Sequence, residues 1–267
     1  MEKFSRILDI PVRMQWEGKG EAVLLLHGYL ETLEVWDEFA EALSKHCKVI
    51  RLDLPGHGFS GTKAEVNSMD DMARVAREVL REAGEEKAHL LGHSMGGYVA
   101  LAFARQFPEA TRSLCLFHST PYADTPEKKD KRQREIELIA GGKLPLLLDA
   151  QMTQVFADEN VDKFEEKIAD MQGCSMVMEP EGVMASIRGL RDREDRQEFL
   201  RAFKQDLLFV FGAKDNFITP ETAEKMKSEF PHAQVLELEH SGHCGFVEEK
   251  DKSVQALLQF WNLEKLQ

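Results

Sequence analysis

The segment Gly92-His93-Ser94-Met95-Gly96 has the residue types and spacing of a site for covalent catalysis. It fits the pattern G-x-S-x-G, directly after an apolar run and directly before a helical pattern. A sharp turn from strand to helix lifts a serine hydroxyl clear of a sheet, and glycines on both sides let the backbone bend that tightly. We therefore predict that Ser94 is the nucleophile of a hydrolytic site.

A serine hydroxyl needs a base within hydrogen-bond reach, because it is a weak nucleophile at neutral pH. Among the nine histidines, His243 lies in Ser241-Gly242-His243, just after the last predicted strand. Active sites collect at the edge of an open α/β sheet where the parallel strands end. We therefore expect His243 to be the base, with His240 on the same loop as the nearest alternative.

The other histidines have simpler interpretations. His93 lies inside the turn that carries the serine and is expected to pack there, pointing away from it. His57, in Pro55-Gly56-His57-Gly58, is expected to be a turn residue. Structural or surface roles are expected for the four that no motif surrounds, namely His46, His89, His118 and His232.

A histidine base needs a carboxylate that fixes its tautomer and stabilises the imidazolium. Asp215 follows the apolar run Leu207–Phe211, in Gly212-Ala213-Lys214-Asp215. Most aspartates in such loops only cap turns. The chain order favours the catalytic role, because Ser94, Asp215 and His243 each come just past a predicted strand.

Acyl transfer also requires donors for the oxyanion that develops on the attacked carbonyl. The backbone N–H of Met95 lies at the positive end of the predicted helix, which suits a negative charge. The second donor is expected from the loop after His27-Gly28, as the N–H of Tyr29.

Apolar runs and helical patterns alternate along the segments that carry these residues. The predicted strands are Val23–His27, Lys48–Leu52, Ala88–Leu91, Ser113–Phe117, Leu207–Phe211 and Gln234–Leu238. The predicted helices are Trp36–Leu43, one capped by Ser68, Met95–Phe107, Glu221–Phe230 and Val247–Trp261. Continuous apolar strands separated by helices indicate a mostly parallel sheet covered on both faces.

The alternation stops between residues 121 and 203. This segment has no strand-like run, only charged and helix-prone sequence interrupted by Gly141-Gly142, Pro145 and Pro180. We therefore expect a helical insertion at 121–203 within a core formed by 1–120 and 204–267.

The sequence resembles the α/β-hydrolase superfamily along nearly its whole length. The resemblance rests on His27-Gly28-Tyr29, Asp53-Leu54-Pro55-Gly56-His57-Gly58-Phe59-Ser60, the turn at Ser94, Gly212-Ala213-Lys214-Asp215 and Ser241-Gly242-His243. It is closest to small carboxylesterase and enol-lactonase-like members.

This resemblance implies an eight-stranded, mostly parallel sheet with helices on both faces and a helical cap at 121–203. Seven strands are the alternative, because the usual first strand has little sequence to occupy and the sheet is expected to begin near Val12–Trp16. The implied activity is cofactor-free cleavage of a small carboxylic ester or lactone. A carbon–carbon-bond hydrolase or lyase with the same triad, or a small-molecule receptor with incidental hydrolysis, are the alternatives.

The bulk composition excludes several other classes of function. The net charge of −13 argues against nucleic-acid binding and against an anionic membrane surface. The N-terminus lacks the apolar core of a signal peptide, and the apolar runs are too short to cross a bilayer. The four cysteines form no C-x-x-C pair. These features predict a cytoplasmic, metal-free protein whose partner is a small molecule.

A basic cluster lies at the start of the insertion, at Lys128, Lys129, Lys131, Arg132 and Arg134. It would suit an acidic carrier protein or an anionic acyl group. Alternatively it is a solvated helix face, because Glu127–Lys131 and Asp130–Arg134 have the spacing of helical ion pairs. The sequence favours the second interpretation.

Overall fold

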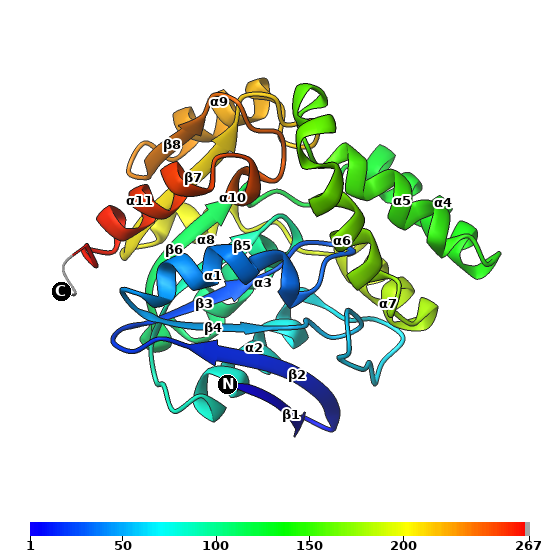
Figure 1. Ribbon diagram of the computed structural model, residues 1–267, viewed down its shortest axis with the longest axis horizontal. Helices are drawn as coiled ribbons and strands as arrows, with labels where there is room; N and C mark the ends of the chain where they lie inside the picture. The colour runs from blue at the N-terminus through cyan, green and yellow to red at the C-terminus, as the bar shows by residue number, and fades with distance from the viewer. Residues whose placement is uncertain (265–267) are drawn as a thin grey trace.

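One mixed sheet of eight strands forms the centre of the computed structural model, which describes residues 1–264 (Figure 1). The strands are β1 (Glu2–Ile7), β2 (Ile10–Glu17), β3 (Ala22–Leu26), β4 (Lys48–Leu52), β5 (Ala88–His93), β6 (Thr111–Phe117), β7 (Asp206–Gly212) and β8 (Gln234–Leu238). Their order is β1-β2-β4-β3-β5-β6-β7-β8, and every pair from β4 onward is parallel. The predicted α/β architecture is confirmed.

The two central strands, β3 and β5, are buried along their whole length. Strands covered on both faces favour apolar side chains at every position. All five residues of β3 are apolar, whereas β5 also contains Gly92 and the buried rings of His89 and His93. β5 pairs with β3 on one side and β6 on the other, and it leads directly to Ser94.

The sheet begins earlier than the sequence predicts. Glu2–Ile7 forms the edge strand β1, which pairs with β2 as an antiparallel hairpin, and β2 pairs antiparallel with β4. The expected start of the sheet near Val12–Trp16 is therefore wrong, as is the seven-stranded alternative, and the prediction of eight strands is confirmed. β1 alternates between exposed and half-buried residues, so it carries no continuous apolar signal.

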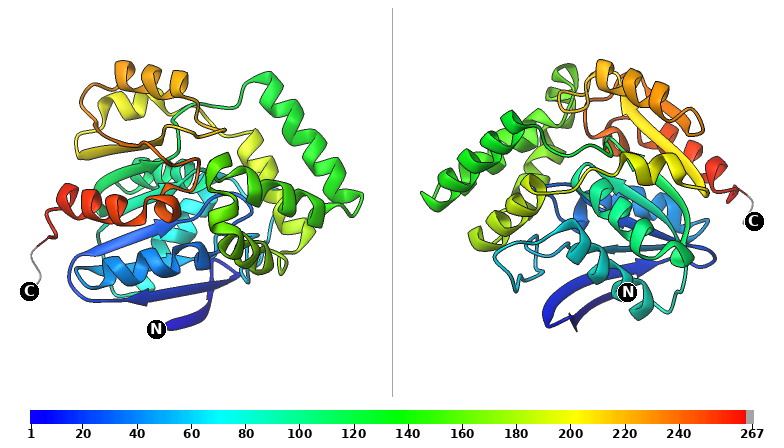
Figure 2. Two further views of the ribbon diagram at one scale, coloured as in Figure 1. Left: turned by 45° about the horizontal axis from the view of Figure 1, so that its top comes forward. Right: turned by 180° about the vertical axis from the view of Figure 1, so that it is seen from behind.

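Helices cover both faces of the sheet. They are α1 (Asp37–Ser44), α2 (Met69–Glu82), α3 (Met95–Gln106), α9 (Pro220–Glu229), α10 (Gly245–Glu248) and α11 (Lys250–Phe260). α1 and α11 pack together on the face toward the viewer in Figure 1, and α2 and α3 pack together on the opposite face, seen in the right view of Figure 2. Ser68 caps α2 as predicted, accepting the Asp71 N–H at 3.1 Å.

The segment between β6 and β7 is helical. It contains α4 (Pro126–Ala140), α5 (Leu144–Gln154), α6 (Glu165–Ser175), α7 (Pro180–Arg191) and α8 (Gln197–Ala202). Short 3-10 turns lie at Leu33–Trp36, Pro108–Ala110, Asp158–Asn160 and Asp162–Phe164. α4 to α7 gather at one side of the sheet (Figure 1). The division at residues 121 and 203 into core and insertion stays a prediction. Across residues 1–264, the helices are too short or too polar to cross a bilayer.

Candidate active site

Ser94 lies in the sharp turn between β5 and α3, with φ 50° and ψ −113°. This backbone conformation is strained for a residue with a side chain, and such strain concentrates at functional sites. Glycines make the turn fit. A Cβ at Gly92 would lie 2.2 Å from the Gly96 carbonyl oxygen, and one at Gly96 would lie 2.1 Å from that of Leu26. The G-x-S-x-G spacing is therefore a steric requirement of this turn.

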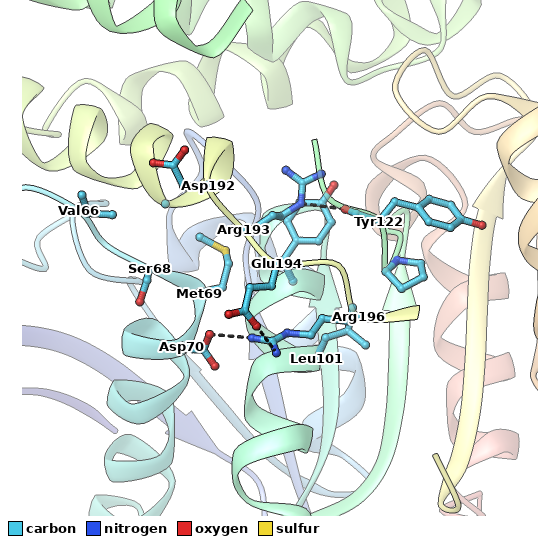
Figure 3. A pocket seen from close by; sticks show the side chains of 13 residues that line it. Val66, Ser68, Met69, Asp70, Leu101, Tyr122, Asp192, Arg193, Glu194 and Arg196 are labelled. Carbon is cyan, nitrogen blue, oxygen red and sulfur yellow. Dashed lines mark hydrogen bonds and ion pairs between the residues drawn. The ribbon is translucent and has the colours of Figure 1, made fainter. Parts of the chain in front are cut away.

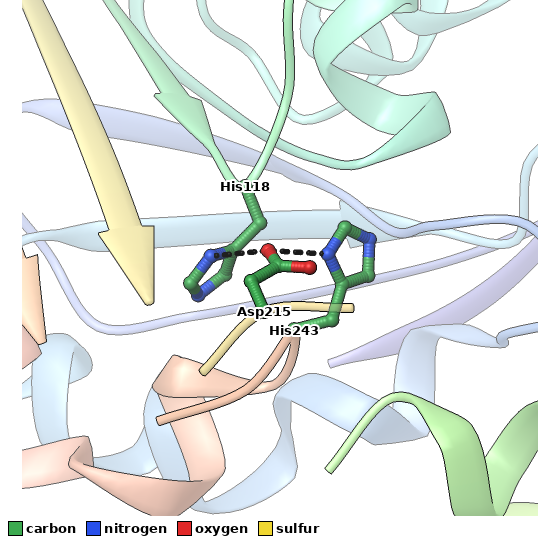
Figure 4. A group of neighbouring side chains, drawn as sticks. All are labelled: His118, Asp215 and His243. Carbon is green, nitrogen blue, oxygen red and sulfur yellow. Dashed lines mark hydrogen bonds and ion pairs between the residues drawn. The ribbon is translucent and has the colours of Figure 1, made fainter. Parts of the chain in front are cut away.

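Asp215 and His243 meet beyond the ends of β7 and β8, as Figure 4 shows. His243 Nδ1 lies 2.8 Å from Asp215 Oδ2, and both side chains are buried. The other carboxylate oxygen accepts the backbone N–H groups of Phe217 and Ile218 at 2.7 and 2.9 Å. The carboxylate is thus fixed by the chain that follows it and can hold one tautomer of the imidazole.

His118, just after β6, is a second histidine on the same carboxylate. Its Nδ1 lies 3.1 Å from Asp215 Oδ2, on the side opposite His243 (Figure 4). The residue is fully buried and has a positive φ of 49°. Sequence reasoning missed this position, because no motif surrounds it.

The electrostatics of this trio follow from burial and pairing. Burial alone would raise the pKa of Asp215, but the charge of His243 and the hydrogen bonds of both rings lower it far below its ordinary value. Burial lowers the pKa of His118 to about 4, although Asp215 opposes the shift. At neutral pH the site therefore holds an ionised Asp215 and a neutral His118.

Asp215, His118 and His243 also group three atoms of metal-binding type within 4.8 Å. The Gly245 N–H donates to His118 Nε2 at 3.2 Å, so the proton of the neutral ring is on Nδ1, facing Asp215. A protonated nitrogen offers no lone pair to a cation. The trio therefore fits a hydrogen-bonded relay better than a metal site.

The two expected oxyanion donors lie close to the serine. The N–H of Met95 is the first of α3, so it has no acceptor inside the helix. The Tyr29 N–H has no acceptor among residues 1–264. The close approach of Gly96 to the end of β3 brings the loop of Tyr29 next to the start of α3.

Ser94 and His243 line one cavity of about 220 Å³. Tyr29 and Met95 line it as well, so all four groups face the same space. Among the residues described, no hydrogen bond joins Ser94 Oγ to the ring of His243. In unliganded enzymes this contact often closes only when substrate binds.

A buried ion pair between His93 and Glu31 lies next to the site. His93 Nδ1 lies 3.0 Å from Glu31 Oε2, and His93 Nε2 lies 2.8 Å from the carbonyl oxygen of His243. The Gly28 N–H donates to the same Glu31 oxygen at 2.6 Å. Burial opposes both charges, but the mutual attraction lowers the pKa of Glu31 and raises that of His93. The pair connects the loop of Tyr29 to the backbone of His243.

Glu248, on α10, holds the loop that carries His243. One of its oxygens accepts the Gly242 N–H at 2.8 Å, and the other accepts the Ala157 N–H at 2.8 Å. Burial raises the pKa of Glu248, although these hydrogen bonds oppose the shift. The contact ties the loop to the segment after α5. Neither Glu31 nor Glu248 carries a local sequence signal for its role.

The remaining histidine candidates lie elsewhere. His240 shares the loop of His243 but is exposed, and only its backbone is bonded, to Glu249 and Asn160. His57 is fully buried in its turn, with its ring 5.2 Å from that of His27. His93 packs within the turn as expected, with the additional contacts described above.

A neighbouring cavity of about 150 Å³ shares Tyr98 with the cavity that Ser94 lines. Figure 3 shows the side chains around this neighbouring cavity, Arg193 and Arg196 among them. Arg196 lies there between Asp70 and Glu194, at 2.7 and 2.8 Å. Arg193 stacks on Tyr98, its Cζ 4.0 Å from the ring centroid, and also reaches Asp124 at 2.8 Å. Both arginines thus have carboxylate partners, and the arrangement indicates a structural junction.

Comparison with known proteins gives concordant results. The family model described as the alpha/beta hydrolase fold matches residues 21–140 and 185–250. The chain is 27% identical to a pimeloyl-[acyl-carrier protein] methyl ester esterase of Vibrio parahaemolyticus, over 90% of this chain and 94% of that protein. It is 31% identical to the dihydrolipoyllysine-residue acetyltransferase component of an acetoin cleaving system of Pseudomonas putida, over 90% of this chain but only 63% of that protein.

Among solved structures, an esterase from Thermogutta terrifontis, described with malate bound, superposes with a TM-score of 0.91. The two chains are 27% identical, and the superposition covers 98% of each. Together with the match to the family model, the eight-stranded sheet and the turn at Ser94 show that the chain belongs to the α/β-hydrolase fold family.

Proposed function

We propose that the protein is a serine carboxylesterase with Ser94 as nucleophile, His243 as base and Asp215 as the carboxylate that orients it. The observation that carries this proposal is the 2.8 Å contact between His243 Nδ1 and Asp215 Oδ2, beside a cavity that Ser94 and His243 both line. With Nδ1 held by the carboxylate, Nε2 is the nitrogen available to the serine hydroxyl.

In the first half of the reaction, Ser94 Oγ attacks the ester carbonyl carbon and His243 Nε2 takes its proton. The negative charge that moves to the carbonyl oxygen is stabilised by the N–H groups of Tyr29 and Met95. As the tetrahedral intermediate collapses, the bond to the alcohol oxygen breaks and His243 returns the proton to it. The alcohol leaves, and the acyl group stays on Ser94.

In the second half, water attacks the acyl carbon and gives a proton to His243. The intermediate again places its charge on the two backbone donors, and its collapse breaks the bond to Ser94 Oγ. The proton on His243 returns to the serine, and the carboxylic acid leaves. The chain's own residues supply every proton transfer in this sequence.

The helical segment at 121–203 acts in this proposal as a cap over the site. Asp124, Lys128 and Gln151, from this segment, line the cavity together with Ser94. A cap of this kind excludes water and sets the shape of the acyl or alcohol subsite. The division of the chain into core 1–120 and 204–267 and cap 121–203 is part of the proposal.

The relatives support ester hydrolysis in particular. The Vibrio protein and the Thermogutta structure are both described as esterases, and each is 27% identical to this chain over nearly its whole length. Lactones have the same carbonyl chemistry, so they belong to the substrates to be tested.

Labelling with a fluorophosphonate probe followed by peptide mapping tests the nucleophile. The probe is expected on Ser94, and modification at another serine would contradict the assignment. Replacing Ser94 by alanine should abolish labelling and lower the hydrolysis of p-nitrophenyl esters by about a millionfold, as in protease triads. The matched control is Ser228→Ala, at an exposed serine on α9, which should label and turn over normally.

The same assay separates the other classes of function. Many turnovers of a p-nitrophenyl ester per protein molecule indicate an enzyme. A single slow turnover with a raised melting temperature indicates a receptor. Faster cleavage of a diketone than of aryl esters would indicate a carbon–carbon-bond hydrolase with the same residues.

A further inference from the structure

One face of α4 lines the cavity that contains Ser94. Lys131, Arg132 and Glu135 follow Lys128 by three, four and seven positions along the helix. All four residues therefore share one face of α4. All four line the cavity. Lys128, Lys131 and Arg132 are called the basic face of α4 below.

Most of the charge at this cavity is paired. Arg132 contacts Glu135 at 3.2 Å and Asp124 at 3.5 Å. Arg193 also contacts Asp124, at 2.8 Å. Two arginines and two carboxylates therefore balance each other.

Lys128 and Lys131 remain as the excess charge. Neither makes an ion pair within residues 1–264. The Glu127–Lys131 and Asp130–Arg134 pairs, expected from their helical spacing, are absent from this part of the chain. The two expected ion pairs are therefore not formed, whereas Lys128 and Lys131 are exposed, as a solvated helix face requires, and also border the cavity.

The basic face lies close to the reacting groups. The guanidinium carbon of Arg132 lies 5.6 Å from the ring centroid of Tyr29, the residue whose N–H is assigned to the oxyanion. Lys128 lies one helical turn before Arg132 on the same face. A negative group a few bonds from the scissile carbonyl would therefore come within reach of the lysine side chains.

We propose that the cavity selects esters carrying a carboxylate, such as half-esters of dicarboxylic acids, and that Lys128 and Lys131 bind this carboxylate. The inference rests on the proposed function and names its substrate class. It explains why a chain of net charge −13 places two unpaired lysines beside its candidate nucleophile. The lysines are exposed, so they attract the anion through water and act mainly on its binding.

The test compares two p-nitrophenyl esters of equal shape. One is the half-ester of adipic acid, and in the other an isopropyl group replaces the free carboxylate. The measured quantity is kcat/KM for the half-ester divided by kcat/KM for the neutral ester, with the full chain as the enzyme. In the double variant Lys128→Gln/Lys131→Gln the ratio should fall by about 2- to 25-fold, because each exposed ion pair contributes a factor of ~1.5 to 5.

The fall should appear mainly in KM for the half-ester, and added salt should reduce the ratio of the unchanged protein. The matched control is Lys129→Gln/Arg134→Gln, which removes the same charge from positions of α4 that do not line the cavity. The control should keep the original ratio.

An equal fall in both double variants, or a protein that prefers the neutral ester, would overturn the inference while leaving the esterase assignment intact. Absence of turnover with both esters would instead contradict the proposed function and, with it, the inference.

Discussion

Asp215 is held by four groups at once, two backbone N–H groups on one oxygen and two imidazoles on the other. Only His243 also faces the cavity. His118 lies on the far side of the carboxylate, where its Gly245 contact fixes the proton on Nδ1. We infer that His118 is a positioning residue of the proposed triad, which helps to keep Asp215 ionised and aimed at His243.

Replacing His118 by leucine should lower kcat for a neutral ester by about 10-fold, with little change in KM. The physical reason is the loss of the 3.1 Å polar contact to a buried charge, worth up to about 1.5–3 kcal/mol, part of which is transmitted to His243. Steady-state kinetics measure this change.

Asparagine at position 118 provides the control. Its amide can place an N–H near the position of Nδ1, and asparagine tolerates the positive φ of 49° found here. His118→Asn should therefore recover most of the lost kcat. Equal losses in both variants would show that the ring only fills space.

At the level of elements, the start of α3 and the end of β3 must approach closely to put the two proposed oxyanion donors, the N–H groups of Met95 and Tyr29, side by side. Gly96 permits this approach, since a Cβ there would lie 2.1 Å from the Leu26 carbonyl oxygen. Because that neighbour is backbone, the clash cannot be relieved by a side-chain rotation.

Gly96→Ala should therefore destabilise the protein by about 2–3 kcal/mol and reduce kcat in the fraction that stays folded. Urea unfolding and ester hydrolysis measure the two effects. The control is Gly173→Ala in α6, where a Cβ meets nothing within 4 Å. It should stabilise the protein by ~0.5–1 kcal/mol, because alanine loses less backbone entropy in a helix. If Gly96→Ala left the free energy of unfolding unchanged, the close approach of α3 to the end of β3 would be contradicted.

The same elements explain what the sequence can and cannot predict. The central strands were predictable because burial on both faces favours apolar runs, as in β3, where all five residues are apolar and buried. The edge strand β1 was not, because its Phe4 and its charged neighbours lie largely in solvent. The start of α2 was predictable from Ser68, whose side chain caps the helix.

The residues of the candidate site can also be divided into those that the sequence predicts and those that it does not. Ser94, Asp215 and His243 are marked by local motifs at strand ends, so their convergence follows from a parallel sheet. His118, Glu31 and Glu248 each depend on at least one partner far along the chain, namely Asp215, His93 and Ala157. Gly245, which fixes the tautomer of His118, is 127 positions away from it. A contact of this kind leaves no pattern in the neighbouring sequence.

At the scale of the whole molecule, buried neutral histidines couple folding to pH. Burial, assisted by repulsion from His27, lowers the pKa of His57 from 6.5 to about 3. In the unfolded chain His57 has its ordinary pKa. Between these two values the unfolded chain binds a proton that the folded protein does not, so stability falls as pH falls from 6.5 toward 3.

His57→Gln removes this contribution, because glutamine does not titrate. The free energy of unfolding from urea titrations at pH 7 and pH 5 should therefore drop less in the variant, by about 2 kcal/mol, since each pH unit below 6.5 costs ~1.4 kcal/mol. The comparison uses the difference between the two pH values, so any loss that the substitution causes at pH 7 cancels. The pKa shifts of His93 and Glu31 are the same in both proteins, so their contributions cancel as well.

The control is His232→Gln, at an exposed position, which should keep the pH dependence of the original protein. An identical drop in His57→Gln and the original protein would mean that the His57 ring binds its proton equally well in the folded and the unfolded chain, and that its burial has no part in the acid sensitivity of the fold.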